Sequence, residues 1–364
     1  MGSQEEWLVS SVDGPAVGEK ITRIGVFSQV HGKDGQRIES VYADLLDAIV
    51  AADELGVDIF WVGQHHVDPS SGRLPSPLPL LAVAAERTRR IRLGTAVSVL
   101  PLEDPIRLAE DAVVVDTLSG GRLELGLGAG GGSARGYSAF GIDNQAQSRR
   151  ALFDAKLDRL LAALGGQPLA VDPDTVRLEP PAATLADRVW ASAGTVERAA
   201  QIGARGLRLL TGTFSDTQQF QREKILAYRK AYLAAGHDPA AIRVSAGRFT
   251  YTGASRAQIE AQVAQGLRTH QRRVAEFDEE LATLSVSDYL RRVTRYGTID
   301  DVIDSLRSDV AIVGLATDFH SILSLYPAAG AVTLGTDVEL ARIRELVEVI
   351  APALGWHPNR GRRE

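Results

Sequence analysis

Two adjacent histidines carry the most distinctive chemistry in this sequence. His65 and His66 lie shortly after the apolar run 57–62, which is typical of a β-strand. Neighbouring side chains in an extended segment point to opposite sides, so at most one of the two imidazoles should face a common cavity. This argues against a metal ion held by both, and no HxH or HxxxE pattern lies nearby. We expect no metal site here, but either a proton donor or acceptor or a structural hydrogen-bonded histidine pair.

A glycine-rich segment is the second candidate. Residues 126–131, GLGAGG, follow another apolar run and match the GxGxxG pattern of dinucleotide-binding loops. In that motif the loop turns straight into a helix, whereas residues 132–136 here predict a longer flexible loop. The segment also follows the fourth predicted strand rather than the first. We therefore interpret the glycines as positions at which a ligand or another backbone segment comes close to the chain, and not as a nicotinamide site.

The third candidate is a run of small residues at a strand end. Ala191 to Thr195, ASAGT, closes the apolar run 189–193 and precedes a helical pattern. Small side chains leave backbone amides open, Ser192 and Thr195 add hydroxyl groups, and Thr195 is suited to cap the helix. Together with the helix dipole, these groups predict an anion site of the kind that binds phosphate. A capped helix without a ligand is the alternative interpretation.

These segments need a scaffold that brings strand ends together, and the rest of the chain predicts one. Predicted strands alternate with helical patterns almost throughout, which favours an α/β fold, a (β/α)8 TIM barrel with insertions, over an open sheet. In such a barrel the active site lies at the carboxyl ends of the strands. The predicted strands are 24–27, 57–62, 91–99, 122–128, 189–193, 206–210, 242–251 and 319–325. The predicted helices are 40–55, 79–88, 105–118, 148–164, 195–202, 215–235, 298–306 and 338–351.

We predict a single barrel domain over residues 22–354, because no change in composition marks a second one. Residues 1–21 are expected to form a flexible arm, and residues 355–364 a tail. Two segments are longer than a strand–helix connection needs and are interpreted as insertions: about 165–181, which contains a hairpin-like stretch, and about 254–296, which is largely helical in pattern.

Composition excludes several classes of protein. The chain has 364 residues and a net charge of −6, which argues against a general nucleic-acid binder. It contains no cysteine, which excludes disulfides, thiolate metal sites and a cysteine nucleophile. No apolar run reaches the roughly 18 residues that a membrane span needs, and the first residues do not form a secretory signal. We therefore expect a cytoplasmic protein that binds neither membranes nor nucleic acid.

Several stretches, taken in order and spacing, resemble one family. They are FWVGQHHV (60–67), the long block 91–130 from IRLGTAVSV to GLGAG, AFGID (139–143), VWASAGTVERAAQIG (189–203) and RYGTIDDVIDSL (295–306). The chain resembles the bacterial luciferase-like monooxygenases, a superfamily of flavin- and deazaflavin-dependent (β/α)8 enzymes. The resemblance spans about residues 22–354, and the block 91–130 is its most specific part.

The resemblance implies roles for individual residues. His65 matches a histidine that acts near the flavin C4a position as a base or proton donor, and His66 matches its supporting neighbour. Ala96 and Val97 match a bulge that in many members holds a cis peptide bond against the isoalloxazine ring. The segment Ser192, Ala193, Gly194 and Thr195 matches the site of the flavin phosphate. We also place in the cofactor site Phe27, Ser98, Gly128, Ala129 and Tyr137.

Two departures from the family bear on the choice of cofactor. Gly128 stands where luciferase itself has a cysteine, and Ala129 stands where luciferase has an arginine that helps to hold phosphate; Arg135 is a candidate to replace it. The sequence GAG at 128–130 is similar to relatives that use the deazaflavin F420. The histidine pair and the segment 139–143, in contrast, are similar to the FMN-dependent group.

The resemblance implies a monooxygenase that uses reduced FMN and O₂, through a flavin C4a-peroxide, to oxidise a small organic substrate. A separate flavin reductase is the expected source of reduced FMN. The alternatives are an F420-dependent oxidoreductase that transfers a hydride, and a non-catalytic flavin-binding protein. We also expect a homodimer, because family members commonly pair through the helices after the second and third strands. The apolar residues available there are Leu80, Leu81, Val83, Ala84, Val113 and Val114.

Overall fold

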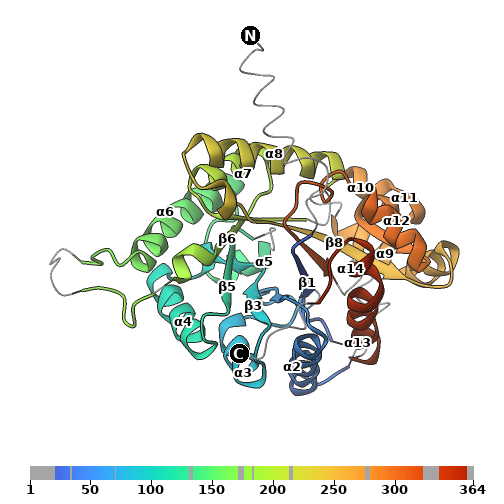
Figure 1. Ribbon diagram of the computed structural model, residues 1–364, viewed down its shortest axis with the longest axis horizontal. Coiled ribbons are helices and arrows are strands. Elements are labelled where there is room, and N and C mark those ends of the chain that lie inside the picture. Colours follow the sequence, from blue (N-terminus) through green and yellow to red (C-terminus); the bar gives the residue numbers. More distant parts are fainter. Residues whose placement is uncertain are drawn as a thin grey trace, which may run out of the picture.

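The central feature of the fold is a closed barrel of eight parallel strands inside a ring of helices (Figure 1). The computed structural model describes residues 21–32, 35–69, 71–130, 134–170, 176–182, 184–212, 216–274, 279–322 and 336–358. The barrel closes because the last strand pairs with both the first and the seventh. Its strands are β1 (Arg23–Ser28), β2 (Ile59–Val62), β3 (Arg92–Thr95) with its continuation β4 (Ser98–Val99), β5 (Leu123–Gly128), β6 (Val189–Ser192), β7 (Arg208–Thr211), β8 (Val244–Thr252) and β10 (Asp318–Ile322). The predicted (β/α)8 barrel is confirmed, whereas most of the predicted arm lies outside the described residues.

The helices of the outer ring follow the apolar periodicity of the sequence. They are α2 (Ile38–Leu55), α3 (Pro77–Arg87), α4 (Pro105–Leu118), α6 (Ala146–Leu164), α7 (Val196–Ala204), α8 (Gln218–Ala234), α12 (Ile299–Arg307) and α13 (Thr336–Glu345). Local signals fix several ends. Asp104 caps α4 by accepting hydrogen bonds from the amides of Ile106 and Arg107, at 2.9 and 3.0 Å. Gly56 ends α2 in the left-handed conformation, with a φ of 90°.

Side chains fill the inside of the barrel, so a ligand could bind only at one of its two ends. Aromatic and aliphatic side chains pack across the middle: Phe27, Ile59, Trp61, Trp190, Leu210, Phe249 and Ile322. Nearer the amino ends of the strands, the buried carboxylate of Glu124 accepts hydrogen bonds from Trp190 Nε1 at 2.6 Å, from Arg208 at 2.7 Å and from Arg92. This network of charges closes that end and leaves the carboxyl ends of the strands as the mouth.

The third strand differs from its prediction. A continuous strand over 91–99 was expected, but β3 ends at Thr95 and β4 begins at Ser98. The ladder is interrupted at Ala96 and Val97, and the peptide bond between these two residues is cis, as the family resemblance implies. The interruption lies at the mouth of the barrel.

One further prediction of local structure is wrong, and one strand was not predicted. Residues 134–136 were expected to prolong a flexible loop but belong to the short helix α5 (Ala134–Ala139). The segment 254–296 is largely helical, as expected, with α9 (Arg256–Val274), α10 (Glu279–Thr283) and α11 (Val286–Val293), and it also contains most of the strand β9 (Thr294–Gly297), which was not predicted. That strand has only four residues and no apolar alternation, so the sequence gives little signal for it.

The 254–296 segment forms a small layer beside the barrel. β8 pairs with β10 over Ser245 to Phe249, and its last residues pair instead with β9. Tyr251 and Tyr296, from these two strands, pack with apolar residues of α9 and α11 in a separate cluster. At the other predicted insertion, the amide of Leu169 donates to the carbonyl of Val176 at 2.9 Å, as in a hairpin, and residues 171–175 lie outside the described part.

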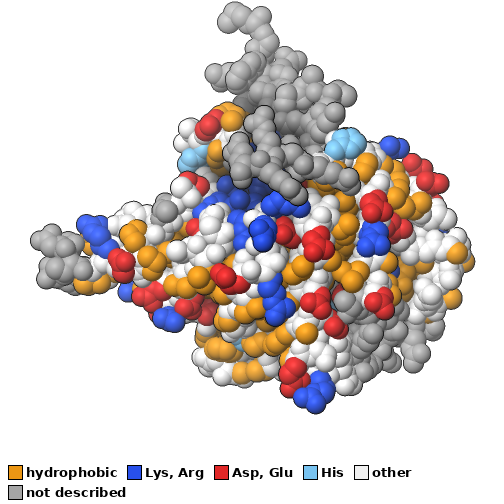
Figure 2. Space-filling view, turned by 60° about the horizontal axis from the view of Figure 1, so that its bottom comes forward, with side chains coloured by type: hydrophobic (Ala, Val, Ile, Leu, Met, Phe, Trp, Pro, Cys, Tyr) orange, Lys and Arg blue, Asp and Glu red, His pale blue; other side chains and the backbone are white. Residues whose placement is uncertain are grey.

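Charges of both signs lie close together on the surface. In Figure 2, Lys and Arg side chains gather near the centre of the visible face, with Asp and Glu side chains beside and below them. Among the described helices, none is both long and apolar enough to cross a membrane.

Candidate active site

The three candidate segments of the sequence meet at one end of the barrel. Because all barrel strands are parallel, the residues that follow β2, β4, β5 and β6 emerge at the same mouth. His65 follows β2, Ala96 and Val97 lie between β3 and β4, Gly128 ends β5, and Ser192 ends β6. The barrel therefore places the predicted proton-transfer group, glycine loop and anion site around one opening.

His65 lies in a narrow slot between two glycines. A Cβ built on Gly63 would lie 3.2 Å from Nε2 of His65 and 3.3 Å from Cζ of Phe27, so the imidazole and the Phe27 ring share this space. A Cβ on Gly72 would lie 2.9 Å from Cγ of the same imidazole. Burial lowers the pKa of His65 to about 4, although the carboxylate of Asp68 opposes the shift. The ring is therefore neutral at pH 7 and does not titrate near neutrality, as a general acid or base there was expected to do.

His66 points to a different neighbour. Its ring packs edge-on against Phe140, with centroids 4.9 Å apart and an angle of 75° between the planes. Its Nε2 atom is buried and has no hydrogen-bond partner in the described part of the chain. Burial lowers the pKa of His66, against the opposing charge of Glu103. The two histidines thus face different surroundings, as the alternation along an extended segment predicts.

Gln64 holds the segment that carries both histidines, and the sequence analysis did not identify it. Its side chain is buried and donates to the carbonyl of Pro75 at 3.0 Å and to Glu103 at 2.6 Å. Its Oε1 accepts a hydrogen bond from the amide of Val99 at 2.6 Å. Gln64 therefore ties the loop after β2 to β4, which fixes His65 relative to the 96–97 bulge. The available signal in the sequence was an amide side chain directly before the histidine pair.

The bulge and the glycine loop form the wall of the opening. Ala96 and Val97 pack against the interior aromatic cluster, and Ser98 is buried and pairs with Leu127. A Cβ built on Gly128 would lie 2.5 Å from Cγ2 of Val97 and 2.7 Å from Oγ of Ser192. Any side chain at Gly128 would therefore clash with Val97 and Ser192, so this position requires glycine because the bulge and the anion loop approach it closely.

Tyr137 and Arg149 hold the glycine loop from outside. The hydroxyl of Tyr137 donates to the carbonyl of Ala129, and Arg149 donates to the carbonyl of Gly130 at 3.0 Å. The guanidinium of Arg149 lies 5.5 Å from the centre of the Tyr137 ring, and its Nε is buried without a described partner. Arg149 was not predicted, whereas the side chain of the predicted Arg135 lies outside the described residues. The signal for Arg149 in the sequence was a basic residue near the start of the helix that follows the glycine loop.

The anion loop presents open backbone groups. Ala193 is buried, whereas Gly194 is exposed, and a Cβ built on Gly194 would meet nothing within 4 Å. Thr195 caps α7, because its hydroxyl accepts a hydrogen bond from the amide of Arg198 at 3.2 Å. Within the described residues, the amides of Gly194 and Thr195 donate no hydrogen bond. Such amides at a helix start are suited to an anion.

His320 is a second interior histidine that the sequence analysis did not identify. It lies on β10, and its Nδ1 forms a hydrogen bond of 2.8 Å with Oγ of Ser245 on β8. Its ring centre is 6.4 Å from those of both Phe27 and Trp61. Burial, assisted by the charge of Arg248, lowers the pKa of His320 to about 3. The sequence offers little signal for it, because Asp318 and Ser321 of the same strand are polar as well.

The neutral His320 predicts a loss of stability at acid pH. Below its ordinary pKa of about 6.5 the unfolded chain takes up a proton that the folded protein does not, so the free energy of unfolding falls with pH. The slope is about 1.4 kcal/mol per pH unit, or about 2 kcal/mol between pH 6.5 and pH 5. Urea denaturation at both pH values should show this extra loss in the wild type relative to His320→Gln. The exposed control His357→Gln should behave like the wild type, and equal losses in all three proteins would contradict the prediction.

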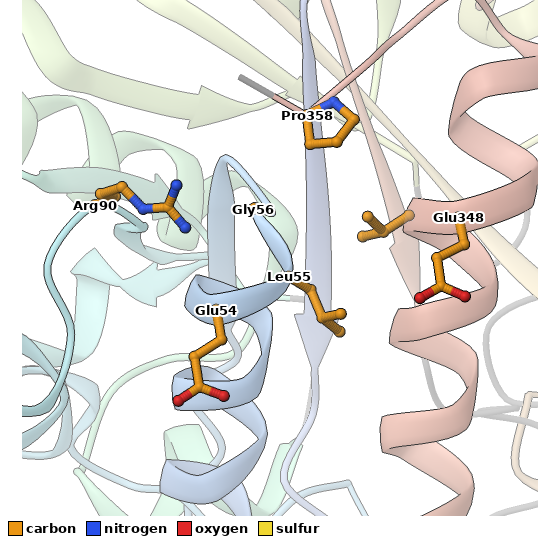
Figure 3. Close-up of a pocket in the computed structure, with 7 residues that line it drawn as sticks. Glu54, Leu55, Gly56, Arg90, Glu348 and Pro358 are labelled. Atoms are coloured by element: carbon orange, nitrogen blue, oxygen red, sulfur yellow. The ribbon is translucent and has the colours of Figure 1, made fainter. Parts of the chain in front are cut away.

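A separate pocket lies at the opposite end of the barrel. It has a volume of about 230 Å³ and is lined by Glu54, Leu55, Gly56, Arg90, Val347, Glu348 and Pro358 (Figure 3). Gly56 ends α2 and precedes β2, so this pocket is near the amino ends of the strands. It is therefore remote from the histidines and from the anion loop.

A comparison with known protein families identifies the family of this chain. Residues 22–319 match the model of the family described as luciferase-like monooxygenase. The chain belongs to the luciferase-like monooxygenase family. The matched residues include β1 to β8 and all three segments of the candidate site.

Individual relatives share parts of the sequence or the fold. The chain is 51% identical over 78 residues to 4-hydroxyprotoasukamycin monooxygenase from Streptomyces nodosus, which is 21% of each chain. The two curated relatives that match first are covered over 40% and 21% of their own lengths. The oxygenating constituent of 3,6-diketocamphane monooxygenase from Pseudomonas putida, solved with FMN, has a TM-score of 0.70 at 16% identity, over 91% of this chain and 98% of that one. A coenzyme F420-dependent tetrahydromethanopterin reductase from Methanopyrus kandleri has a TM-score of 0.63 at 15% identity, over 88% and 97%.

Proposed function

We propose that this protein is an FMN-dependent monooxygenase that oxidises a small organic substrate with O₂. The observation that carries the proposal is the single barrel mouth around which an open anion loop, the bulge packed against Gly128 and a partly buried neutral histidine are arranged. The FMN-containing monooxygenase from Pseudomonas putida, which has the same fold, supports the choice of cofactor. A separate reductase would supply reduced FMN.

The residues around the opening fit FMN. Ser192, the amide of Gly194 and the start of α7 would hold the phosphate, and Arg149 adds a cation near the glycine loop, with a buried Nε that lacks a described partner. Gly128 lets this loop and the 96–97 bulge lie close together, and the isoalloxazine ring would lie against the bulge together with Phe27. Ala129, Tyr137 and Ser98 would shape this wall without supplying charge.

Reduced FMN, when bound, supplies the electrons that activate O₂. The protein's own contribution is to position the reactants and to exclude water from a filled barrel. The low pKa of His65 keeps its imidazole neutral, so the ring would donate or accept a hydrogen bond without carrying a permanent charge. One ring nitrogen would pass the proton. His66 would support this segment through its contact with Phe140.

The second candidate function is that of an F420-dependent oxidoreductase, which would use the same opening for hydride transfer. The sequence GAG at 128–130 and the shared fold with the reductase from Methanopyrus kandleri favour it. The third is a flavin-binding protein without catalytic activity. All three predict a cofactor at the mouth, and they differ in which cofactor binds and whether O₂ is consumed.

Cofactor binding and oxygen uptake test the proposal. Purified protein would be titrated with FMN and with F420, each oxidised and reduced, and O₂ consumption would be followed with reduced FMN and candidate substrates. We expect tighter binding of FMN, and O₂ uptake coupled to product formation. Tighter binding of F420 with hydride transfer would support the second function, and binding of FMN without turnover would support the third.

We further propose a homodimer formed through α3 and α4, which lie next to each other in the ring (Figure 1). Of the six apolar residues expected at this interface, Leu80, Leu81, Ala84 and Val113 are buried in the protein's own core, which corrects that expectation. Val83 and Val114 remain 44% and 47% exposed, and Leu118 is 49% exposed. The available apolar surface is therefore smaller than expected, but both helices contribute to it.

Charged residues at this face are expected to separate the dimer. The double variant Val83→Glu and Val114→Glu would place two carboxylates in the interface, so light scattering at micromolar concentration should show a monomer where the wild type is a dimer. The control Val310→Glu changes another exposed valine outside α3 and α4 and should remain a dimer. A monomeric wild type would reject the proposed interface.

A further inference from the structure

A lysine without access to solvent lies directly behind the anion loop. Lys224 on α8 is 0% exposed, which is rare for lysine unless its charge is paired. Its Nζ donates to the carbonyl oxygen of Ala193 at 3.0 Å and forms an ion pair with Asp216. The same ammonium group lies 5.1 Å from the centre of the Phe220 ring. Lys224 therefore joins α8 to the loop after β6 and to the loop after β7.

The bond to Ala193 has a consequence for the next amide. In a trans peptide unit the C=O of one residue and the N–H of the next point in opposite directions. Since Lys224 draws the Ala193 carbonyl toward α8, the N–H of Gly194 must point away from α8. This is the amide that has no partner within the described residues, and the space on the outer side of Gly194 is open.

We propose that Lys224 is a positioning residue for the phosphate of the cofactor. It holds the 193–194 peptide in the orientation that offers the Gly194 amide to an anion, without itself contacting that anion. Asp216 balances the charge of the buried lysine, so the hydrogen bond to Ala193 is made without leaving an unpaired ion in the core. This inference rests on the proposed function, because it assumes a phosphate-bearing cofactor at the anion loop.

A purely structural lysine would make a different prediction. If Lys224 only joined α8 to the barrel, its loss would lower stability and would affect all ligands of the mouth alike. If it orients the anion loop, its loss affects ligands with a phosphate and spares those without one. The ratio of the dissociation constants for FMN and riboflavin separates these two roles, because riboflavin lacks the phosphate.

The test uses the double variant Lys224→Met with Asp216→Asn, which removes the hydrogen bond and leaves no unpaired buried charge. Binding of FMN and of riboflavin would be measured by quenching of flavin fluorescence. We expect FMN to bind about 10-fold more weakly or worse, and riboflavin to change by less than about 3-fold. Lys230→Met is the matched control, since Lys230 is an exposed lysine on the same helix, and it should change neither constant.

The possible results are distinct. Equal changes for FMN and riboflavin, or no change for FMN, would overturn the role of Lys224 while leaving the proposed function intact. A wild-type protein that binds FMN no better than riboflavin would overturn the proposed phosphate site itself. Thermal unfolding establishes that the double variant is folded. If it is not, Lys224→Leu with Asp216→Asn likewise removes the donor and leaves no unpaired charge, and the same change in the ratio is expected.

Discussion

Replacing Ser192 by alanine and Thr195 by valine is expected to weaken FMN binding by about 30- to 150-fold. Both hydroxyls are at the start of α7, beside amides that have no described partner, and a cofactor phosphate would accept hydrogen bonds from them. Each such bond contributes about 1 to 1.5 kcal/mol, so losing two gives this range. Alanine is chosen at Ser192 because it removes the hydroxyl without adding side-chain volume next to Gly128. Titration with FMN and with riboflavin should show a much smaller loss for riboflavin.

The control for this experiment must separate binding from helix capping. Thr195 also caps α7, and its loss is expected to cost about 1 kcal/mol of stability. Thr298→Val removes the equivalent cap of α12, which lies away from the anion loop, and should lower stability without changing FMN affinity. Equal losses of affinity for FMN and riboflavin in the double variant would mean that this loop does not recognise phosphate.

The arrangement of the mouth followed from the sequence because it depends on strand order alone. Once eight parallel strands close into a barrel, residues that end different strands must meet, however far apart they are in the chain. His65, Gly128 and Ser192 each follow a strong apolar run, so their common location could be predicted. The N-cap at Thr195 could be predicted for the same reason, since capping depends on neighbouring residues.

The supporting residues could not be predicted because their role depends on contacts between distant elements. Arg149 contacts the glycine loop only because the start of α6 folds back over it, and Lys224 reaches Ala193 only through the packing of α8 against the barrel. The side chain of His320 can be assigned to the inside of the barrel only when the register of β10 against β8 is known. Sequence periodicity gives the face of a helix or strand, but not the partner that this face meets.

The protonation state of His65 shows the same limit. Its type and position suggested a group that titrates near pH 7, since an exposed imidazole does so. The slot between Gly63 and Gly72 lowers its pKa to about 4, and that slot is formed by a loop closing over the ring. Burial, which the sequence does not reveal for a loop residue, therefore decides the charge of this group.

His65→Ala is expected to lower turnover by about 100-fold or more, the usual scale for the loss of a group that transfers a proton. Because the wild-type imidazole is neutral throughout pH 6 to 8, its contribution should not vary with pH in that range, and the ratio of wild-type to variant turnover should stay constant. FMN affinity should change by less than about 3-fold, because His65 is not part of the anion loop. His357→Ala, at an exposed histidine, is the control and should retain full activity. Unchanged turnover in His65→Ala would mean that the imidazole only fills its slot and that the proton moves through another group.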